Sequence, residues 1–292
     1  MLHSILLLLS LLSQPQGVPP ADAASWLAHP LIAHALGGID GHDLTNSREA
    51  FETNYAKGIR VFETDLMPTR NLKDLVAKHD WTKEQYQKFE QDEYVPVDGE
   101  WYPLSLEEFL KVPINHRYTP LAWTDLLDLL ATHPDAFLVL DTKFTDQATV
   151  LKQYGILVKE AEDKDPALLN RVIPQLYHQD MLAWIESVHV FPSYIYTLYQ
   201  TKDTNQQVID FVRSHLRVQA ITMAESRAVK SFVQSLNQAG ARVFVHTVNS
   251  KASFDKYRKI GVFGVYTDFL HYSDIAKGIK GSWTAQPPLP AE

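Results

Sequence analysis

The chain has 292 residues, and its 27 Lys and Arg against 35 Asp and Glu give a formal net charge of −8. Its 45% apolar and 21% charged residues are typical of a globular protein, and the acidic balance argues against a basic surface for nucleic acid or anionic membranes. With no cysteine and 12 histidines, disulfides, thiolate zinc sites and a cysteine nucleophile are excluded, so metal or acid–base chemistry must use histidines and carboxylates.

The first 23 residues have the pattern of a secretory signal peptide. The apolar run Ile5–Leu12 is too short to span a bilayer, which takes ~20 residues. Ala21-Asp22-Ala23 offers a small-x-small cleavage site, although His3 is the only basic candidate before the run. We expect cleavage after Ala23, a secreted or extracytoplasmic protein, and one domain over residues 24–292 without a later transmembrane segment. An uncleaved anchor or a packed N-terminal helix is the alternative.

Strand-like and helix-like segments alternate along the rest of the chain. Strands are expected at Leu31–Ala35, Ile59–Leu66, Phe137–Asp141, Arg171–Leu176, Ser193–Leu198, Val218–Thr222, Arg242–Thr247 and Gly264–Thr267. Helices are expected between them at Ser47–Lys57, Trp123–Thr132, Asp146–Ala161, Asp180–Ser187, Thr204–Ser214, Glu225–Ala239 and Lys251–Lys259. This alternation indicates parallel βαβ units, and the number of units fits a single (β/α)8 TIM barrel, an α/β fold of about 250 residues. A doubly wound sheet is the alternative, but the glycines from Gly37 to Gly41 lack the G-x-G-x-x-G spacing.

A polar insertion interrupts this alternation after the second strand. It extends over about residues 81–120 and is rich in aromatic residues, namely Trp81, Tyr86, Tyr94, Trp101, Tyr102 and Tyr118. Long insertions after a barrel strand commonly form lids or substrate walls. We therefore expect such a wall or, alternatively, a surface subdomain with its own small core.

Acidic residues lie near the ends of two expected strands, and TIM-barrel active sites lie at such C-terminal ends. Glu63 and Asp65 are two residues apart, so both carboxylates face the same side of their strand. Asp141 and Lys143 repeat this spacing on the next barrel strand. Each acid alone could be salt-bridged or solvated, but three converging carboxylates predict a site for Mg²⁺ or Ca²⁺. Lys143 could be the counter-ion of Asp141 or could bind an anionic substrate oxygen.

Two histidines are expected at the same rim. His34 lies near the end of the first strand, and His79 follows the apolar run Leu75–Ala77, which is expected to return toward the rim. Two imidazoles beside a cation could divide the work of general base and general acid. His246 also ends a strand and is expected to line the pocket. The other histidines considered are expected to be structural: His29, His116, His133, His178, His189, His215 and His271.

Several short motifs occur in a characteristic order: His34, Asn46-Ser47 before Phe51, Glu63-Thr64-Asp65, His79-Asp80, Asp141-Thr142-Lys143, His246-Thr247-Val248-Asn249 and Thr267-Asp268. In this order they resemble the glycerophosphodiester phosphodiesterase family. The resemblance covers about residues 31–270. That family belongs to the phospholipase-C-like phosphodiesterases, which have a TIM-barrel fold, in agreement with the strand pattern.

The resemblance implies a function for each of the candidate residues. The catalytic histidines would be His34 and His79, the ligands of a divalent cation (Mg²⁺ or Ca²⁺) would be Glu63, Asp65 and Asp141, and the substrate-binding residues would be Lys143, Asn46 and His246. The sequence departs from the usual family pattern at three of its positions. Ala35 stands where a phosphate-contacting arginine is usual, Thr45 replaces a glutamate, and Asp141 replaces a glutamate as in the similar sphingomyelinase D branch.

The sequence therefore predicts a metal-dependent phosphoric diester hydrolase. Its expected substrate is a small-molecule glycerophosphodiester or a lipid with a phosphodiester head group, and no nucleic-acid partner is expected. Two alternatives from other classes are a TIM-barrel glycoside hydrolase that uses paired carboxylates and a barrel that binds phosphodiesters or lipid with little turnover.

Overall fold

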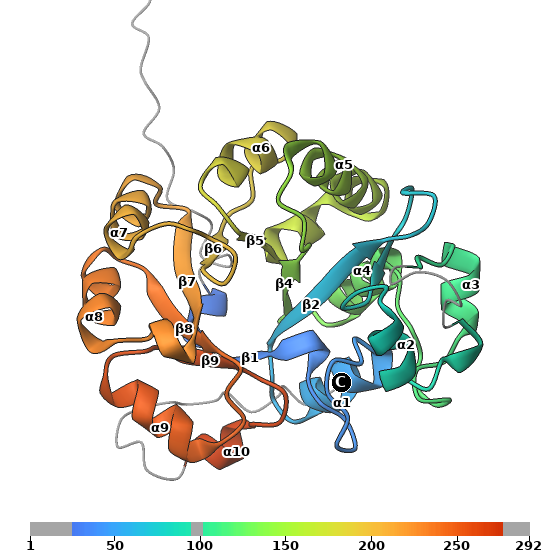
Figure 1. The fold of residues 1–292 in the computed structure, drawn as a ribbon, viewed down its shortest axis with the longest axis horizontal. Coiled ribbons are helices and arrows are strands. Elements are labelled where there is room, and N and C mark those ends of the chain that lie inside the picture. Colours follow the sequence, from blue (N-terminus) through green and yellow to red (C-terminus); the bar gives the residue numbers. More distant parts are fainter. Residues whose placement is uncertain (1–24, 95–101, 277–292) are drawn as a thin grey trace, which may run out of the picture.

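A closed ring of eight parallel strands forms the centre of the protein. The structure is a computed structural model that describes residues 25–94 and 102–276. The strands follow the order β1-β9-β8-β7-β6-β5-β4-β2, and β1 also pairs with β2, which closes the ring. Figure 1 shows the strands at the centre and the helices around them. The prediction of a TIM barrel is confirmed.

The barrel strands and the short β3 have these bounds: β1 Leu31–Ala33, β2 Val61–Pro68, β3 Leu75–Ala77, β4 Phe137–Asp141, β5 Val172–Leu176, β6 Tyr194–Thr197, β7 Val218–Ala224, β8 Arg242–His246 and β9 Gly264–Thr267. The α-helices are α1 Arg48–Ala56, α2 Lys83–Lys88, α3 Leu106–Lys111, α4 Trp123–Thr132, α5 Gln147–Lys164, α6 Asp180–Val188, α7 Asn205–Ser214, α8 Lys230–Gln238, α9 Lys251–Lys259 and α10 Tyr272–Ile275.

Two apolar layers hold the barrel together. Alternate strand residues such as Val61 and Val139 point into the barrel and join an inner cluster, whereas Phe62 and Leu138 point outward into the core beneath the helices. The side-chain period of two along a strand explains the position of the acids, because the inward-facing row that begins at Val61 continues with Glu63 and Asp65. The barrel interior is therefore apolar toward the N-terminal ends of the strands and charged at their C-terminal ends.

Most expected elements agree with the structure to within three residues at each end, and two of the differences have a clear structural cause. The first strand ends at Ala33, and the chain turns over His34–Leu36 because Ala35 and Leu36 have φ of 49° and 66°, left-handed values that no β-strand accommodates. The helix expected from Glu225 begins at Lys230, after a separate 3-10 turn over Glu225–Arg227. The first difference matters for the site, because it turns the chain sharply at His34.

The expected insertion after the second strand is present, and its described part has its own core. β3 pairs antiparallel with the end of β2, and α2 and α3 lie beside these strands (Figure 1). The shared apolar cluster consists of Met67, Val76, Trp81, Tyr86, Leu104, Phe109 and Val112. This arrangement favours the surface subdomain over a simple lid. Trp101 and the expected signal peptide lie outside the described residues.

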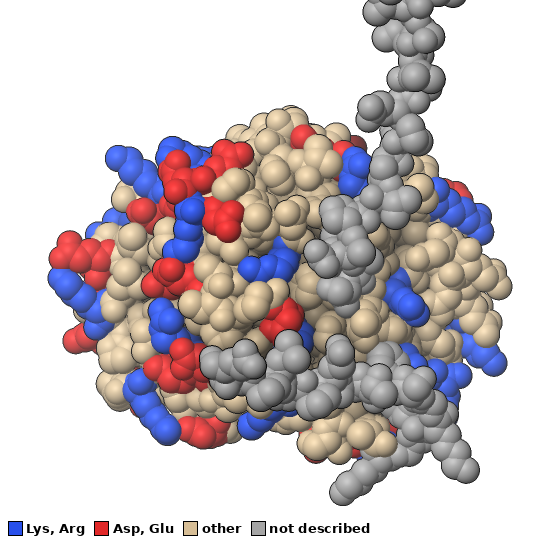
Figure 2. All heavy atoms as spheres, turned by 180° about the vertical axis from the view of Figure 1, so that it is seen from behind, with Lys and Arg blue, Asp and Glu red and all other residues tan. Residues whose placement is uncertain are grey.

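The face opposite to that of Figure 1 carries both signs of charge. In Figure 2, Lys and Arg lie next to Asp and Glu along the left side of the molecule, as on an ordinary solvated surface. Among the helices of the described ranges, none is both long and apolar enough to span a membrane.

Candidate active site

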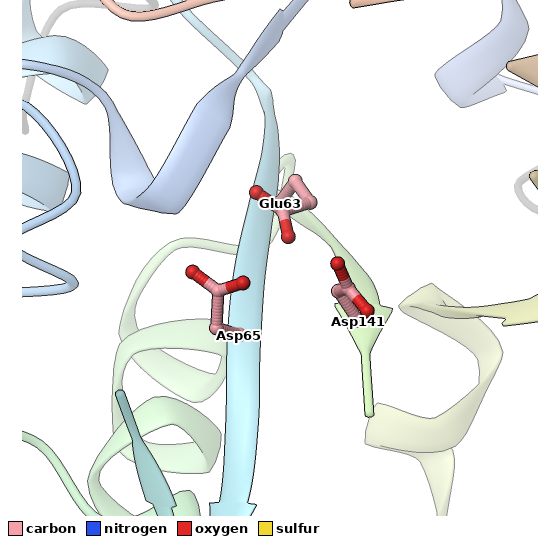
Figure 3. Close-up of side chains that lie close together, drawn as sticks. All are labelled: Glu63, Asp65 and Asp141. Carbon is pink, nitrogen blue, oxygen red and sulfur yellow. The ribbon is translucent and has the colours of Figure 1, made fainter. Parts of the chain in front are cut away.

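Three buried carboxylates meet at the C-terminal end of the barrel. Glu63 and Asp65 project from β2 and Asp141 from the end of β4, toward one another (Figure 3). The register between these strands places Asp65 directly opposite Asp141, and one oxygen from each of the three carboxylates lies within 4.8 Å of the others. The structure thus brings together the three residues that the sequence indicated as metal ligands.

Lys143 provides the positive charge within this acidic cluster. Its Nζ atom lies 2.5 Å from Oδ1 of Asp65 and 2.6 Å from Oδ2 of Asp141. Burial lowers the pKa of Lys143, but the two aspartates outweigh it and raise the pKa well above its usual value. One ammonium group against three carboxylates leaves the cluster with an excess of negative charge.

The pKa values of the carboxylates reflect this imbalance. Burial and then the charge of Asp65 raise the pKa of Glu63 to about 8. Burial would also raise the pKa of Asp65, but the positive charges of Lys143 and His79 lower it below its usual range. The cluster therefore holds a proton on Glu63 at neutral pH unless further positive charge is supplied.

The loop after β1 fixes two of the carboxylates. The backbone N–H of Ala35 donates a hydrogen bond to Oε2 of Glu63 at 2.8 Å, and Nδ2 of Asn46 donates to Oδ2 of Asp65 at 2.8 Å. Oδ1 of Asn46 accepts hydrogen bonds from Thr64 Oγ1 and the Asp65 N–H. Asn46, which was expected to bind substrate, is buried and holds Asp65, one of the three candidate metal ligands.

The ring of His34 is oriented by a carboxylate from the far end of the sequence. Nδ1 of His34 donates to Oδ1 of Asp268 at 2.8 Å, and Oδ2 of Asp268 accepts a hydrogen bond from Nδ2 of Asn249 at 2.6 Å. Burial lowers the pKa of His34, but the hydrogen bond to Asp268 and the charges of Glu63 and Asp65 together raise it to about 9. His34 is therefore charged at neutral pH, and Asp268 fixes its ring.

His79 is held in the same manner by its neighbour in the sequence. Its Nδ1 atom lies 2.9 Å from Oδ2 of Asp80, and Oδ1 of Asp80 accepts hydrogen bonds from the N–H and the hydroxyl of Thr82. Burial raises the pKa of Asp80, but these hydrogen bonds outweigh it and lower the pKa to about 2. Asp80 therefore stays charged and fixes the His79 ring.

His246 lies at the end of β8, and no carboxylate among the described residues holds its ring in this way. Its Nδ1 atom is 3.0 Å from Thr222 Oγ1, and its ring meets the ring of Tyr199 edge-on at 6.0 Å. Burial and then the charge of His34 lower the pKa of His246 to about 4. At neutral pH it is an uncharged residue of the wall.

Two tyrosines that the sequence did not single out complete the surroundings of Asp141. The Tyr177 hydroxyl donates to Oδ1 of Asp141 and accepts from the Lys143 N–H at 2.9 Å. The Tyr199 hydroxyl lies 3.4 Å from each oxygen of the same carboxylate. Tyr177 directly follows β5 and Tyr199 follows β6 by two residues, so the rule that selects residues after strand ends could have found both.

A family assignment follows from the sequence as a whole. The model of the glycerophosphoryl diester phosphodiesterase family matches residues 38–271. The chain belongs to this family. It is therefore a member of a class of phosphoric diester hydrolases, in agreement with the predicted family and enzyme class. Members generally use a divalent metal ion, and the three carboxylates form a group that could bind one.

Solved structures with the same fold include a phosphodiesterase and two glycerophosphodiester phosphodiesterases. A phosphodiesterase from Oleispira antarctica, in complex with the product sn-glycerol-3-phosphate, has 16% identity and a TM-score of 0.67, over 87% of this chain and 98% of that chain. A glycerophosphodiester phosphodiesterase from Thermotoga maritima has 16% identity and a TM-score of 0.61, over 82% and 94% of the two chains. One from Agrobacterium tumefaciens has 14% identity and a TM-score of 0.58, over 82% and 96%. Among curated proteins, none matches the chain in sequence.

Proposed function

We propose that this family member is a divalent-cation-dependent hydrolase of glycerophosphodiesters or of phospholipid-like head groups. The observation that carries the proposal is the convergence of three buried carboxylates, one lysine and two carboxylate-held histidines at one end of the barrel. Family membership supports phosphodiester chemistry rather than the glycoside-hydrolase alternative. The product named for the Oleispira antarctica phosphodiesterase supports a small phosphate ester as the reaction's product.

The acidic cluster fits a hard cation in both its donor set and its charge. Glu63, Asp65 and Asp141 would hold the ion, because Mg²⁺ and Ca²⁺ prefer carboxylate oxygens, and the single ammonium of Lys143 does not neutralise them. When bound, the cation would supply Lewis-acid polarisation of a phosphate oxygen and charge neutralisation.

The two histidines are suited to move protons at the phosphodiester. Asp268 and Asp80 accept from the Nδ1 atoms of His34 and His79, which leaves each Nε2 atom to exchange a proton with substrate. One histidine would take the proton of the attacking hydroxyl and the other would protonate the leaving alkoxide. The attacking group would be water or a neighbouring hydroxyl of the substrate, and the latter would give a cyclic phosphate first. Lys143 would stabilise negative charge that develops on the phosphoryl oxygens.

A panel of phosphodiesters, assayed with and without EDTA, tests this function. Glycerophosphodiesters and lysophospholipids are supplied to the wild type and to His34→Ala, His79→Ala and His116→Ala, the last being an exposed histidine of the insertion. We expect EDTA to abolish turnover and both active-site variants to lose about 100-fold or more in kcat, with His116→Ala unaffected. Activity that resists EDTA, or full activity in both variants, contradicts the mechanism, and binding without turnover favours the binding-protein alternative.

We also propose that the protein is exported after removal of residues 1–23. The apolar run Ile5–Leu12 and the Ala21-Asp22-Ala23 pattern support this proposal. Amino-terminal sequencing of the protein purified from its source would begin at Ala24 if the proposal is correct. A protein that retains Met1 would show that the segment is not removed.

A further inference from the structure

Tyr199 reaches the acidic cluster while remaining open to solvent. It follows β6, which lies three strands from β2 around the ring, and its hydroxyl lies 3.4 Å from both oxygens of Asp141. Tyr199 is nevertheless 46% exposed, whereas Tyr177, the other tyrosine at this carboxylate, is 1% exposed. The Tyr199 side chain is therefore in contact both with solvent and with the carboxylate of Asp141.

The ring and the hydroxyl of Tyr199 are held in place by their neighbours. The ring meets that of Tyr177 at 5.7 Å and that of His246 at 6.0 Å, both edge-on. Nε2 of Gln200 donates to the Tyr199 hydroxyl at 3.0 Å and to the Lys143 carbonyl at 3.3 Å. Because Gln200 is the donor, the hydroxyl proton of Tyr199 remains available for an acceptor.

Asp141 does not need that proton. Its Oδ1 atom already accepts a hydrogen bond from Tyr177, and its Oδ2 atom lies 2.6 Å from the Lys143 ammonium. The distance of 3.4 Å from Tyr199 to each oxygen is longer than an ordinary O–H···O hydrogen bond, which is about 2.7 Å. The phenol is thus a fixed donor that is only weakly engaged.

The position of Tyr199 matches a need of the proposed reaction. A phosphodiester bound between Lys143 and the two histidines has two non-bridging oxygens. Negatively charged oxygens in a buried site need hydrogen-bond donors. The side chain of Ala35, in the turn beside Glu63, is a methyl group that cannot supply one. We propose that the Tyr199 hydroxyl donates a hydrogen bond to a non-bridging oxygen of the substrate phosphate. This proposal rests on the proposed phosphodiesterase function and makes Tyr199 a substrate-contacting residue.

Two single substitutions, each of which removes one tyrosine hydroxyl, test the proposal. Tyr199→Phe and Tyr177→Phe are compared with the wild type by calorimetric titration of Mg²⁺ or Ca²⁺ and, with the cation saturating, of sn-glycerol 3-phosphate. We expect Tyr199→Phe to weaken sn-glycerol 3-phosphate binding about tenfold or more, because a hydrogen bond to a charged group is lost, and to raise KM for the phosphodiester similarly. Cation affinity should remain within about twofold of the wild type. Tyr177→Phe should instead weaken cation binding, because the Tyr177 hydroxyl holds Asp141.

The outcomes separate this proposal from the function on which it rests. A Tyr199→Phe variant that binds sn-glycerol 3-phosphate as the wild type does overturns the contact. A variant that loses cation affinity as strongly as Tyr177→Phe also overturns it, because Tyr199 would then act by positioning Asp141. A wild type that binds sn-glycerol 3-phosphate but hydrolyses no phosphodiester would overturn the proposed function alone, and the binding data would still decide the contact. A wild type that neither binds nor hydrolyses overturns both.

Discussion

Nδ1 of His34 and Oδ1 of Asp268 lie 2.8 Å apart although 234 residues separate them in the sequence. The pairing of β1 with β9 joins the first and the last strand of the barrel and places Ala33 opposite Thr267, so the residues that follow the two strands, His34 and Asp268, lie side by side. The pairing of β1 with β9 therefore also brings Asp268 to the position from which it orients His34, a candidate catalytic residue.

Asp268→Asn should therefore impair turnover without unfolding the protein. An amide in place of the carboxylate can donate to Nδ1 and so favours the wrong tautomer of His34, and we expect kcat to fall about 100-fold or more. The control is Asp163→Asn, which removes an exposed carboxylate paired with Lys159. A variant with wild-type kcat would show that Asp268 does not orient His34.

The same substitution has a pH signature in stability. The folded-state pKa of His34, about 9, lies above its ordinary value of 6.5, so the interactions of charged His34 stabilise the cation-free fold fully below about pH 6.5 and are lost as the pH rises through about 9. Urea unfolding should show that Asp268→Asn costs more stability at about pH 6 than at about pH 10. An equal cost at both pH values would contradict the raised pKa.

Cation binding should release a proton from Glu63. Burial and Asp65 raise the pKa of Glu63 to about 8, so the cation-free protein carries this proton at neutral pH, and a cation must displace it to gain the carboxylate. Affinity for Mg²⁺ or Ca²⁺ should rise with pH until about pH 8 and then level off. Calorimetry in two buffers of different ionisation enthalpy measures the release. Glu63→Gln should abolish it and the exposed Glu52→Gln should not, and proton-independent binding in the wild type would refute this assignment.

Lys143→Met should destabilise the cation-free protein. It leaves Asp65 and Asp141 without the ammonium that lies 2.5 and 2.6 Å from them, and loss of one partner of a buried ion pair costs about 3 kcal/mol. Saturating cation should reduce this difference, because it neutralises the same carboxylates. Urea unfolding with EDTA and with cation measures both values. The exposed Lys159→Met should cost under about 1 kcal/mol, and an equally small cost at Lys143 would show that its pairing does not stabilise the fold.

The barrel and its acids were predictable because their signals are local. The row of Val61, Glu63 and Asp65 in β2 shows in the sequence which side chains point inward, and Val139 and Asp141 repeat it in β4. Parallel pairing of these two strands then brings the acids together with few further assumptions. Lys143 follows from the same spacing, and its two ion pairs show that it contacts the acids directly.

The contacts that orient the site were not predictable in this way. Tyr177 lies 36 residues from Asp141 and Tyr199 lies 58 residues from it, so their convergence depends on the register of two further strands, β5 and β6. The turn at Ala35 could not be predicted for another reason. Left-handed φ values are usually signalled by glycine, but the two residues that adopt them here are Ala35 and Leu36. Hydrogen bonds such as that from the Ala35 N–H to Glu63 hold this turn, and they exist only in the closed barrel.

Lys78, beside His79, offers a test of a buried charge. It is 5% exposed, and its Nζ atom lies 4.7 Å from the centre of the Tyr86 ring and 5.4 and 5.7 Å from those of Trp81 and Phe89. Burial lowers the pKa of Lys78 from 10.5 to about 8, which corresponds to a penalty of roughly 3 kcal/mol for the charged form. Attraction to the rings returns about 2 kcal/mol, so we expect Lys78→Met to raise the free energy of unfolding by about 1 kcal/mol at neutral pH.

The pH dependence of this gain distinguishes desolvation from a packing effect. Between about pH 8 and pH 10.5 the unfolded chain binds a proton at Lys78 that the folded chain does not, so wild-type stability rises with pH over this range. The advantage of Lys78→Met should fade accordingly, whereas the exposed Lys230→Met should show no such trend. If Lys78→Met is instead less stable than the wild type at neutral pH, the attraction of the three rings exceeds the cost of burial, and the ammonium is a net stabilising link between the barrel and the insertion.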